Sequence, residues 1–212
     1  ELRLHDAFDG TLSRVDADGK TTVVLASPLL KNAGNCTFGP TGDLYVLSWE
    51  RGGVVKLDAA GKELGIVKSG RDENTFRWPR AFTVSPDRDL LVVDGRGSRV
   101  FCYDADLKFR WRLDPQDAAN GRSRSDVTAV RVDRAGKIHL LSADDGCVWT
   151  FDRERKPVTT LRPDEKRLGT LRHPGAMDID ADGTIYVADT GNNRIVVLET
   201  RIPNPGPDPE PE

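Results

Sequence analysis

The sequence predicts an all-β protein built from a repeated four-stranded unit, and three observations lead to this prediction. Short apolar runs alternate with turn residues along the whole 212-residue chain. Strand-opening residues recur at steps of 42, 46, 48 and 47 residues, at Leu2, Leu44, Leu90, Ile138 and Ile185. The repeats do not show the apolar period of 3.6 residues that a helical repeat requires. A period in the forties with four strands per unit is typical of a β-propeller blade.

Residues 173–199 show the repeated unit most clearly. They read HPGAMDIDADGTIYVADTGNNRIVVLE, in which turns at 182–183 and 190–193 separate three apolar runs. Asp-Gly between alternating apolar runs is a strong hairpin signal, because glycine adopts the positive φ of a tight turn. The stretch is therefore expected to form three consecutive antiparallel strands.

The chain divides into five repeats. Repeat 1 (residues 1–26) supplies strands equivalent to the second, third and fourth of a unit. Repeats 2, 3 and 4 (29–68, 76–113 and 126–161) each contain four strands, and repeat 5, from residue 173, contains strands one to three. The gaps in the first and last repeats do not complement each other. We therefore expect a domain that starts upstream and forms a five- or six-bladed ring.

Two repeats resemble the NHL repeat. Residues 173–199 are similar to its consensus nearly end to end, and WPRAFTVSPDRDLLVVDGRGSRVFCYD at 78–104 is a good second match. The repeats around Leu44 and Ile138 keep the pattern but lack several of its residues. The resemblance implies an NHL-type β-propeller over residues 1–200, and family habit implies an extracytoplasmic location. It implies no single function, because related propellers bind proteins, RNA or small molecules, and a few are enzymes.

Composition limits the remaining possibilities. Residues 201–212, with five prolines and three acids, cannot join a sheet or a core and are expected to be a linker or tail. A net charge of −3 does not favour attraction of the whole molecule to nucleic acid or anionic membrane. The sequence has no run of 18 apolar residues, so no membrane insertion is expected. The three cysteines lie in different repeats and are expected to be small buried residues.

The long connections between repeats are the predicted binding surface. In a propeller, these connections and the turns between strands two and three share one face, which we call the long-loop face. Here the connections vary in length (27–35, 69–80, 114–127 and 162–175), and variable loops on a rigid scaffold commonly carry binding. The candidate contact residues on this face are basic or aromatic: Trp49, Arg71, Phe76, Arg77, Trp78, Arg80, Arg122, Arg124 and Arg172.

Two repeats carry an Asp and an Arg five residues apart, across the turn between strands two and three. The pairs are Asp94 with Arg99 and Asp189 with Arg194. A guanidinium fork on a carboxylate fixes the shape of such a turn. We interpret both pairs as structural rather than as an anion site, since a partnered Arg has few donors left.

These observations favour a non-catalytic scaffold, a module of a longer protein, that binds a protein or peptide. The sequence has no nucleophile elbow and no phosphate-binding loop. His5, His139 and His173 fall at positions that do not converge, so neither a metal nor another cofactor is predicted. Two alternatives stay open. One is a lyase or lactonase with a metal at the axis, held by carboxylates such as Asp126 and Asp178. The other is single-stranded RNA binding through the mildly basic loop face.

Overall fold

The computed structural model describes residues 2–95, 99–115 and 126–198, which form five small antiparallel sheets. Sheets 1 and 5 have three strands each, and sheets 2, 3 and 4 have four. The strands of sheets 1 and 2 are β1 (Leu2–Asp6), β2 (Thr11–Val15), β3 (Thr21–Ala26), β4 (Ala33–Phe38), β5 (Leu44–Ser48), β6 (Gly53–Leu57) and β7 (Glu63–Lys68). Those of sheet 3 are β8 (Pro79–Val84), β9 (Leu90–Asp94), β10 (Arg99–Tyr103) and β11 (Phe109–Leu113). Those of sheets 4 and 5 are β12 (Val127–Val132), β13 (Ile138–Ser142), β14 (Cys147–Phe151), β15 (Pro157–Leu161), β16 (Ala176–Ile179), β17 (Ile185–Asp189) and β18 (Arg194–Leu198).

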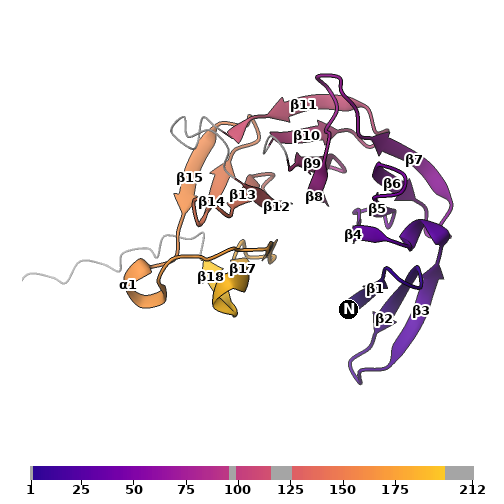
Figure 1. The fold of residues 1–212 in the computed structure, drawn as a ribbon, viewed down its shortest axis with the longest axis horizontal. Helices are drawn as coiled ribbons and strands as arrows, with labels where there is room; N and C mark the ends of the chain where they lie inside the picture. The colour runs from indigo at the N-terminus through magenta and orange to yellow at the C-terminus, as the bar shows by residue number, and fades with distance from the viewer. Residues whose placement is uncertain (1, 96–98, 116–125, 199–212) are drawn as a thin grey trace, which may run out of the picture.

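Each sheet is a meander in which consecutive strands pair in sequence order. The sheets follow one another around a common centre, with β4, β8 and β12 on the inside and β7, β11 and β15 on the outside (Figure 1). This arrangement confirms the predicted all-β propeller. The number of blades observed is five, so the six-bladed possibility is not what the described residues show.

An Asp side chain builds the turn between the third and fourth strands. Asp104 directly follows β10 and accepts hydrogen bonds from the N–H groups of Asp106 and Lys108, both at 2.9 Å. The same bond to the residue four positions later recurs at Asp16, Asp58 and Asp152. The residue three positions after the aspartate has a left-handed backbone in all four of these turns. It is Gly19, Gly61, Leu107 or Arg155, with φ of 79°, 81°, 63° and 67° respectively. The carboxylate therefore fixes the turn, whichever residue occupies the left-handed position.

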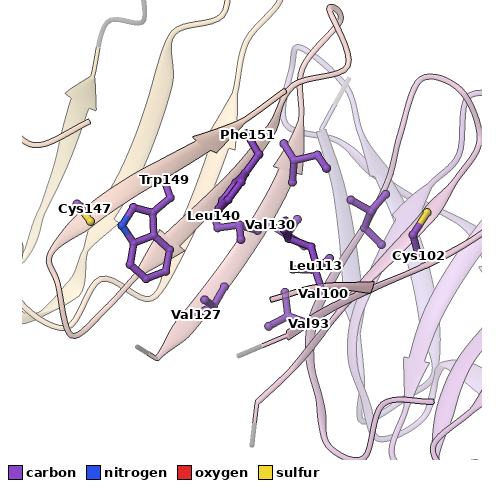
Figure 2. Packing of buried hydrophobic residues seen from close by; sticks show 12 residues of the cluster. Val93, Val100, Cys102, Leu113, Val127, Val130, Leu140, Cys147, Trp149 and Phe151 are labelled. Carbon is purple, nitrogen blue, oxygen red and sulfur yellow. The ribbon is translucent and has the colours of Figure 1, made fainter. Parts of the chain in front are cut away.

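Neighbouring sheets pack face to face through buried apolar side chains. Figure 2 shows the cluster between sheets 3 and 4, which joins Val93, Val100, Cys102 and Leu113 to Val127, Val130, Leu140, Cys147, Trp149 and Phe151. Two of the three cysteines lie in this cluster and all three are free thiols. Equivalent clusters join the other neighbouring sheets, so the core is divided among the interfaces between blades.

Short helical segments interrupt connections that were expected to be plain loops. A 3-10 turn, η1 (Pro28–Leu30), follows Ser27, whose side chain accepts a hydrogen bond from the Leu29 N–H. The helix α1 (Glu165–Leu168) follows Asp164, which caps it in the same way, and ends at Gly169 with φ of 65°. A second 3-10 turn, η3 (Thr190–Asn192), precedes β18. None of the described helices has the length and apolarity needed to cross a membrane.

Candidate functional site: the long-loop face

Exposed aromatic side chains gather at one end of sheets 1 to 3. Phe8 lies in the turn between β1 and β2, Trp49 in the turn between β5 and β6, and Trp78 just before β8. In a meander these three positions belong to the long-loop face. Phe8 is 89% exposed, Trp49 54% and Trp78 53%. Large aromatic residues exposed to this degree on one face are candidates for contact with a partner.

Trp49 is held in place although half of it is exposed. Its indole lies over Gly34, the second residue of β4. A Cβ built on Gly34 would fall 2.8 Å from the indole Nε1 and 2.9 Å from two ring carbons. The turn is further fixed by Ser48, whose hydroxyl accepts a hydrogen bond from the Arg51 N–H at 3.2 Å. The ring thus rests on bare backbone and presents its other side to solvent.

The loop that carries Trp78 is fastened at both ends. Phe76 is fully buried, edge-on to Phe101 and Tyr103 at centroid distances of 6.5 and 6.1 Å. It therefore anchors the loop to the core and offers no side-chain surface to a partner. Asp94, at the end of β9, accepts hydrogen bonds from the N–H groups of Arg77 and Trp78, both at 3.2 Å. The backbone that precedes β8 is consequently preorganised.

The basic candidates are spread along the same face. Arg71, Arg77 and Arg172 are exposed, and Arg80 forms an ion pair with Asp126 of the next repeat. The positive charge of Arg80 is therefore partly offset by the carboxylate of Asp126. Arg122 and Arg124 lie outside the described residues.

The two Asp–Arg pairs differ in the structure. Arg194 Nε donates to Asp189 Oδ2 at 2.7 Å, and Asn192 Nδ2 donates to the same oxygen at 2.8 Å. Asp189 also accepts from the Arg172 N–H at 2.6 Å and is fully buried. Burial alone would raise the pKa of this carboxyl. The hydrogen bonds and the Arg194 charge lower the pKa by more than burial raises it, so the pKa lies below its ordinary value.

In sheet 3, Arg99 is the strand partner of Asp94 across the β9–β10 pair. Its guanidinium Nε reaches outward to Asp114 Oδ2 at 3.2 Å. Asp94 and Asp189 nevertheless occupy the same place at the end of a second strand, and both carboxylates fasten the loop that leads into strand one of their own sheet.

The histidines are separate from one another. His5 contacts the Leu30 carbonyl at 2.9 Å. His139 is buried in β13 between Thr150 Oγ1 at 3.1 Å and Asp133 Oδ2 at 3.3 Å, and burial lowers its pKa. Within residues 2–95, 99–115 and 126–198, no three His, Cys, Asp or Glu side chains come together in a way that would hold a metal ion.

Comparison with known families identifies the repeat. A family model for the NHL repeat matches residues 171–198, which contain β16, β17 and β18 and the buried Asp189 pair. The fold is a β-propeller, and it contains an NHL repeat. A search among curated proteins found no match.

Solved structures share the fold of this NHL propeller. It is similar to virginiamycin B lyase from Staphylococcus aureus at 13% identity and a TM-score of 0.60, covering 92% of this chain and 65% of that one. A streptogramin B lyase gives 12% identity and a TM-score of 0.61, with 92% and 64% covered. A protein of unknown function from Bacteroides caccae gives 13% and 0.58, with 89% and 71% covered. The NHL propeller spans less than two thirds of the length of either lyase, and at these identities the likeness concerns the fold.

Sequence reasoning missed one group of charged residues in the NHL propeller. Arg110, Arg153 and Arg155 lie on the opposite face, between sheets 3 and 4. They come from two repeats, so their proximity is not visible in either repeat alone. The one signal in the sequence was the turn RERK at 153–156, which places an arginine where repeats 1 and 2 have glycine.

Proposed function

We propose that this NHL propeller is a binding module that holds a protein or peptide segment against its long-loop face. The observation that carries the proposal is the pair Trp49 and Trp78. Both indoles are about half exposed, sit on neighbouring sheets, and stand on backbone that other contacts have already fixed. A rigid aromatic side chain loses little entropy when a partner covers it, which is why tryptophans dominate binding energy at protein interfaces.

The test is a selection of displayed peptides on the immobilised full chain, followed by affinity measurement with labelled synthetic peptides. Trp49→Ala combined with Trp78→Ala should weaken binding by at least about 30-fold, the loss expected when an interface hot spot is truncated. Leu64→Ala is the matched control, because Leu64 is equally exposed (52%) but lies on the outer strand β7. Equal affinity of the double variant and the wild-type chain would contradict the proposal.

Single-stranded RNA is the second ligand class to test on the same face. Arg77→Glu with Arg80→Glu should abolish binding of a labelled oligonucleotide if RNA is the ligand, and binding should fall steeply with salt. If the chain binds RNA, and both the tryptophan and the arginine substitutions remove this binding, then RNA replaces the peptide as the ligand.

Lyase activity is a further candidate, which the fold shared with virginiamycin B lyase favours. The described residues contain no group of three potential metal ligands, so the reaction would need side chains from outside them. Mass spectrometry of virginiamycin B incubated with the protein, with and without added divalent cations, tests it. Unchanged antibiotic would set this candidate aside.

A further inference from the structure

A pocket of about 220 Å³ opens on the face opposite the long-loop face, between sheets 3 and 4. Its wall on sheet 3 comes from the turn between β8 and β9 and from Trp111 on β11. Its wall on sheet 4 comes from the turns that follow β12 and β14. Leu91 and Ile138, both in the buried cluster between the sheets, form its apolar floor. The volume is below the range that holds drug-sized ligands, so a small molecule or a single chemical group fits.

Two of the three arginines in this pocket have carboxylate partners. Arg110 Nη1 lies 2.6 Å from Asp89 Oδ2. Arg153 Nη1 lies 3.4 Å from Asp87 Oδ2, and its Nε donates to the Ala135 carbonyl at 2.7 Å. These two pairs leave one positive charge in the pocket without a carboxylate, that of the third arginine.

The third arginine, Arg155, is fixed in place by an aromatic ring. Its guanidinium carbon lies 5.0 Å from the centre of the Trp111 ring, a cation–π contact across the interface of the two sheets. Among the described residues, no acceptor bonds the guanidinium N–H groups of Arg155. A planar guanidinium that is held from one side and keeps its donors available matches the two oxygens of a carboxylate or a phosphate.

The backbone at Arg155 points the same way. Its φ of 67° is left-handed, a conformation that costs an L-residue energy and that glycine adopts freely. Repeats 1 and 2 place glycine at this position of the turn, Gly19 and Gly61. Repeat 3 also departs from glycine here, with Leu107 at φ of 63°, so the strain is kept where the side chain at this position reaches the neighbouring sheet.

The neighbouring interface serves as an internal comparison. Between sheets 2 and 3 the equivalent residue is Leu107, and it covers Gly65 in place of a tryptophan. The pocket there is lined by one cation, Lys56, which is paired with Asp43 at 3.3 Å, and by one acid, Asp106. The same turn thus lies beside a pocket without surplus positive charge at one interface and beside a pocket with one at the next.

We propose that the pocket between sheets 3 and 4 binds a compact oxyanion, a carboxylate or a phosphate group, on the guanidinium of Arg155 stacked against Trp111. The charges of Arg110 and Arg153 are offset by Asp89 and Asp87, so the surplus positive charge is that of Arg155. This site is on the opposite face from the proposed partner surface, and neither depends on the other.

The experiment uses the full chain labelled with 5-fluorotryptophan, and Trp111→Phe assigns the Trp111 resonance in fluorine NMR. Inorganic phosphate and succinate are titrated separately at constant ionic strength maintained with sodium chloride. The Trp111 resonance should move along a saturable curve with at least one of the two anions, and the anion that saturates identifies the source of the oxyanion. Trp49 and Trp78, on the far face, should not move.

Arg155→Gly is the decisive variant, because glycine accepts the left-handed backbone and should leave the turn folded. It should weaken the saturable response at least tenfold, whereas Leu107→Gly, the same change at the neighbouring interface, should leave it intact. Circular dichroism and thermal melting confirm that both variants are folded. A response that is linear in both anions, or that is equally strong in Arg155→Gly, would overturn the proposal.

Discussion

Replacing Asp189 by Asn tests whether a buried carboxylate holds the NHL repeat together. The Asp189 side chain has no solvent-exposed surface and accepts three hydrogen bonds, from the Arg172 N–H, Asn192 Nδ2 and Arg194 Nε, at 2.6, 2.8 and 2.7 Å. In Asp189→Asn the amide oxygen can keep the bond from Arg172. The amide nitrogen then faces two donors, and the ion pair with Arg194 is lost.

The expected loss of stability follows from these contacts. Breaking a buried charge pair by removing one partner costs about 3–5 kcal/mol, and hydrogen bonds to a charged group contribute about 1.5–3 kcal/mol each. The Arg194 side chain is 31% exposed and can be hydrated after the change, so the lower end applies. We expect about 3 kcal/mol, which is a urea midpoint lower by about 1 M for a slope of about 2.5 kcal/mol per molar.

Urea unfolding followed by circular dichroism measures the change, and Ser142→Ala is its matched control. Ser142 ends β13 as Asp189 ends β17 and is equally buried, but its side chain is uncharged: the hydroxyl donates to Asp145 Oδ2 and accepts from the Asp145 N–H, both at 3.1 Å. Its removal should cost about 1.5 kcal/mol, the low end for a hydrogen bond to a charged group, because Asp145 is only partly buried. Equal midpoints for Asp189→Asn and the wild-type chain, or a larger loss in Ser142→Ala, would refute the assignment.

Acid pH gives an independent check on the same residue. Because the pKa of Asp189 is lowered in the folded state, its charge stabilises the fold above the ordinary carboxyl pKa of about 4. That stabilisation is lost as pH falls through the lower folded pKa. The difference in stability between the wild-type chain and Asp189→Asn should therefore shrink from pH 7 toward pH 3. A constant difference would show that the charge of the carboxylate is not what matters.

Three further predictions follow from buried groups and tight backbone contacts. Burial lowers the pKa of His139, so stability should fall as pH drops below the ordinary value of about 6.5, and His139→Gln should flatten that slope in urea midpoints. Burial raises the pKa of Cys147 to about 11, so alkylation mapped by mass spectrometry at pH 8 should label the partly exposed Cys36 first. A Cβ on Gly53 would fall 2.1 Å from a backbone oxygen of β7, so Gly53→Ala should cost about 3 kcal/mol or prevent folding. In Gly42→Ala the added Cβ meets nothing within 4 Å, but the backbone is left-handed with φ of 86°, so this variant should cost about 1 kcal/mol from backbone strain alone, less than Gly53→Ala.

The fold was predictable because its determinants are local. Alternating apolar residues define the strands, and turn residues such as Asp182 and Gly183 place the reversals between them. In repeats 1 to 4 the aspartate that follows the third strand is visible in the sequence, and the structure explains it as the acceptor that builds the next turn. The short helix α1 escaped prediction because one cap and one glycine suffice to form a single turn within a polar loop.

The candidate site was less predictable because burial depends on how loops return to the core. Phe76 and Trp78 stand two residues apart in a loop rich in polar residues, and the sequence does not distinguish them. In the structure Phe76 is fully buried and Trp78 is 53% exposed, because Asp94 fixes the backbone between them. The pocket between sheets 3 and 4 was hidden for another reason: Trp111 and Arg155 belong to different repeats and meet only when blades pack.

The turn between the third and fourth strands links these observations. Its shape is set by backbone N–H groups bound to one aspartate, so the residue in the left-handed position is not needed to form it. That residue points across to the fourth strand of the preceding sheet, as Gly61 does toward Leu25, Leu107 toward Gly65 and Arg155 toward Trp111. The propeller can thus change the chemistry of each groove between blades with two substitutions that leave its hydrogen bonds intact. Because the framework is separate from the lining, a groove with surplus positive charge and a groove without one occur side by side in one repeated architecture.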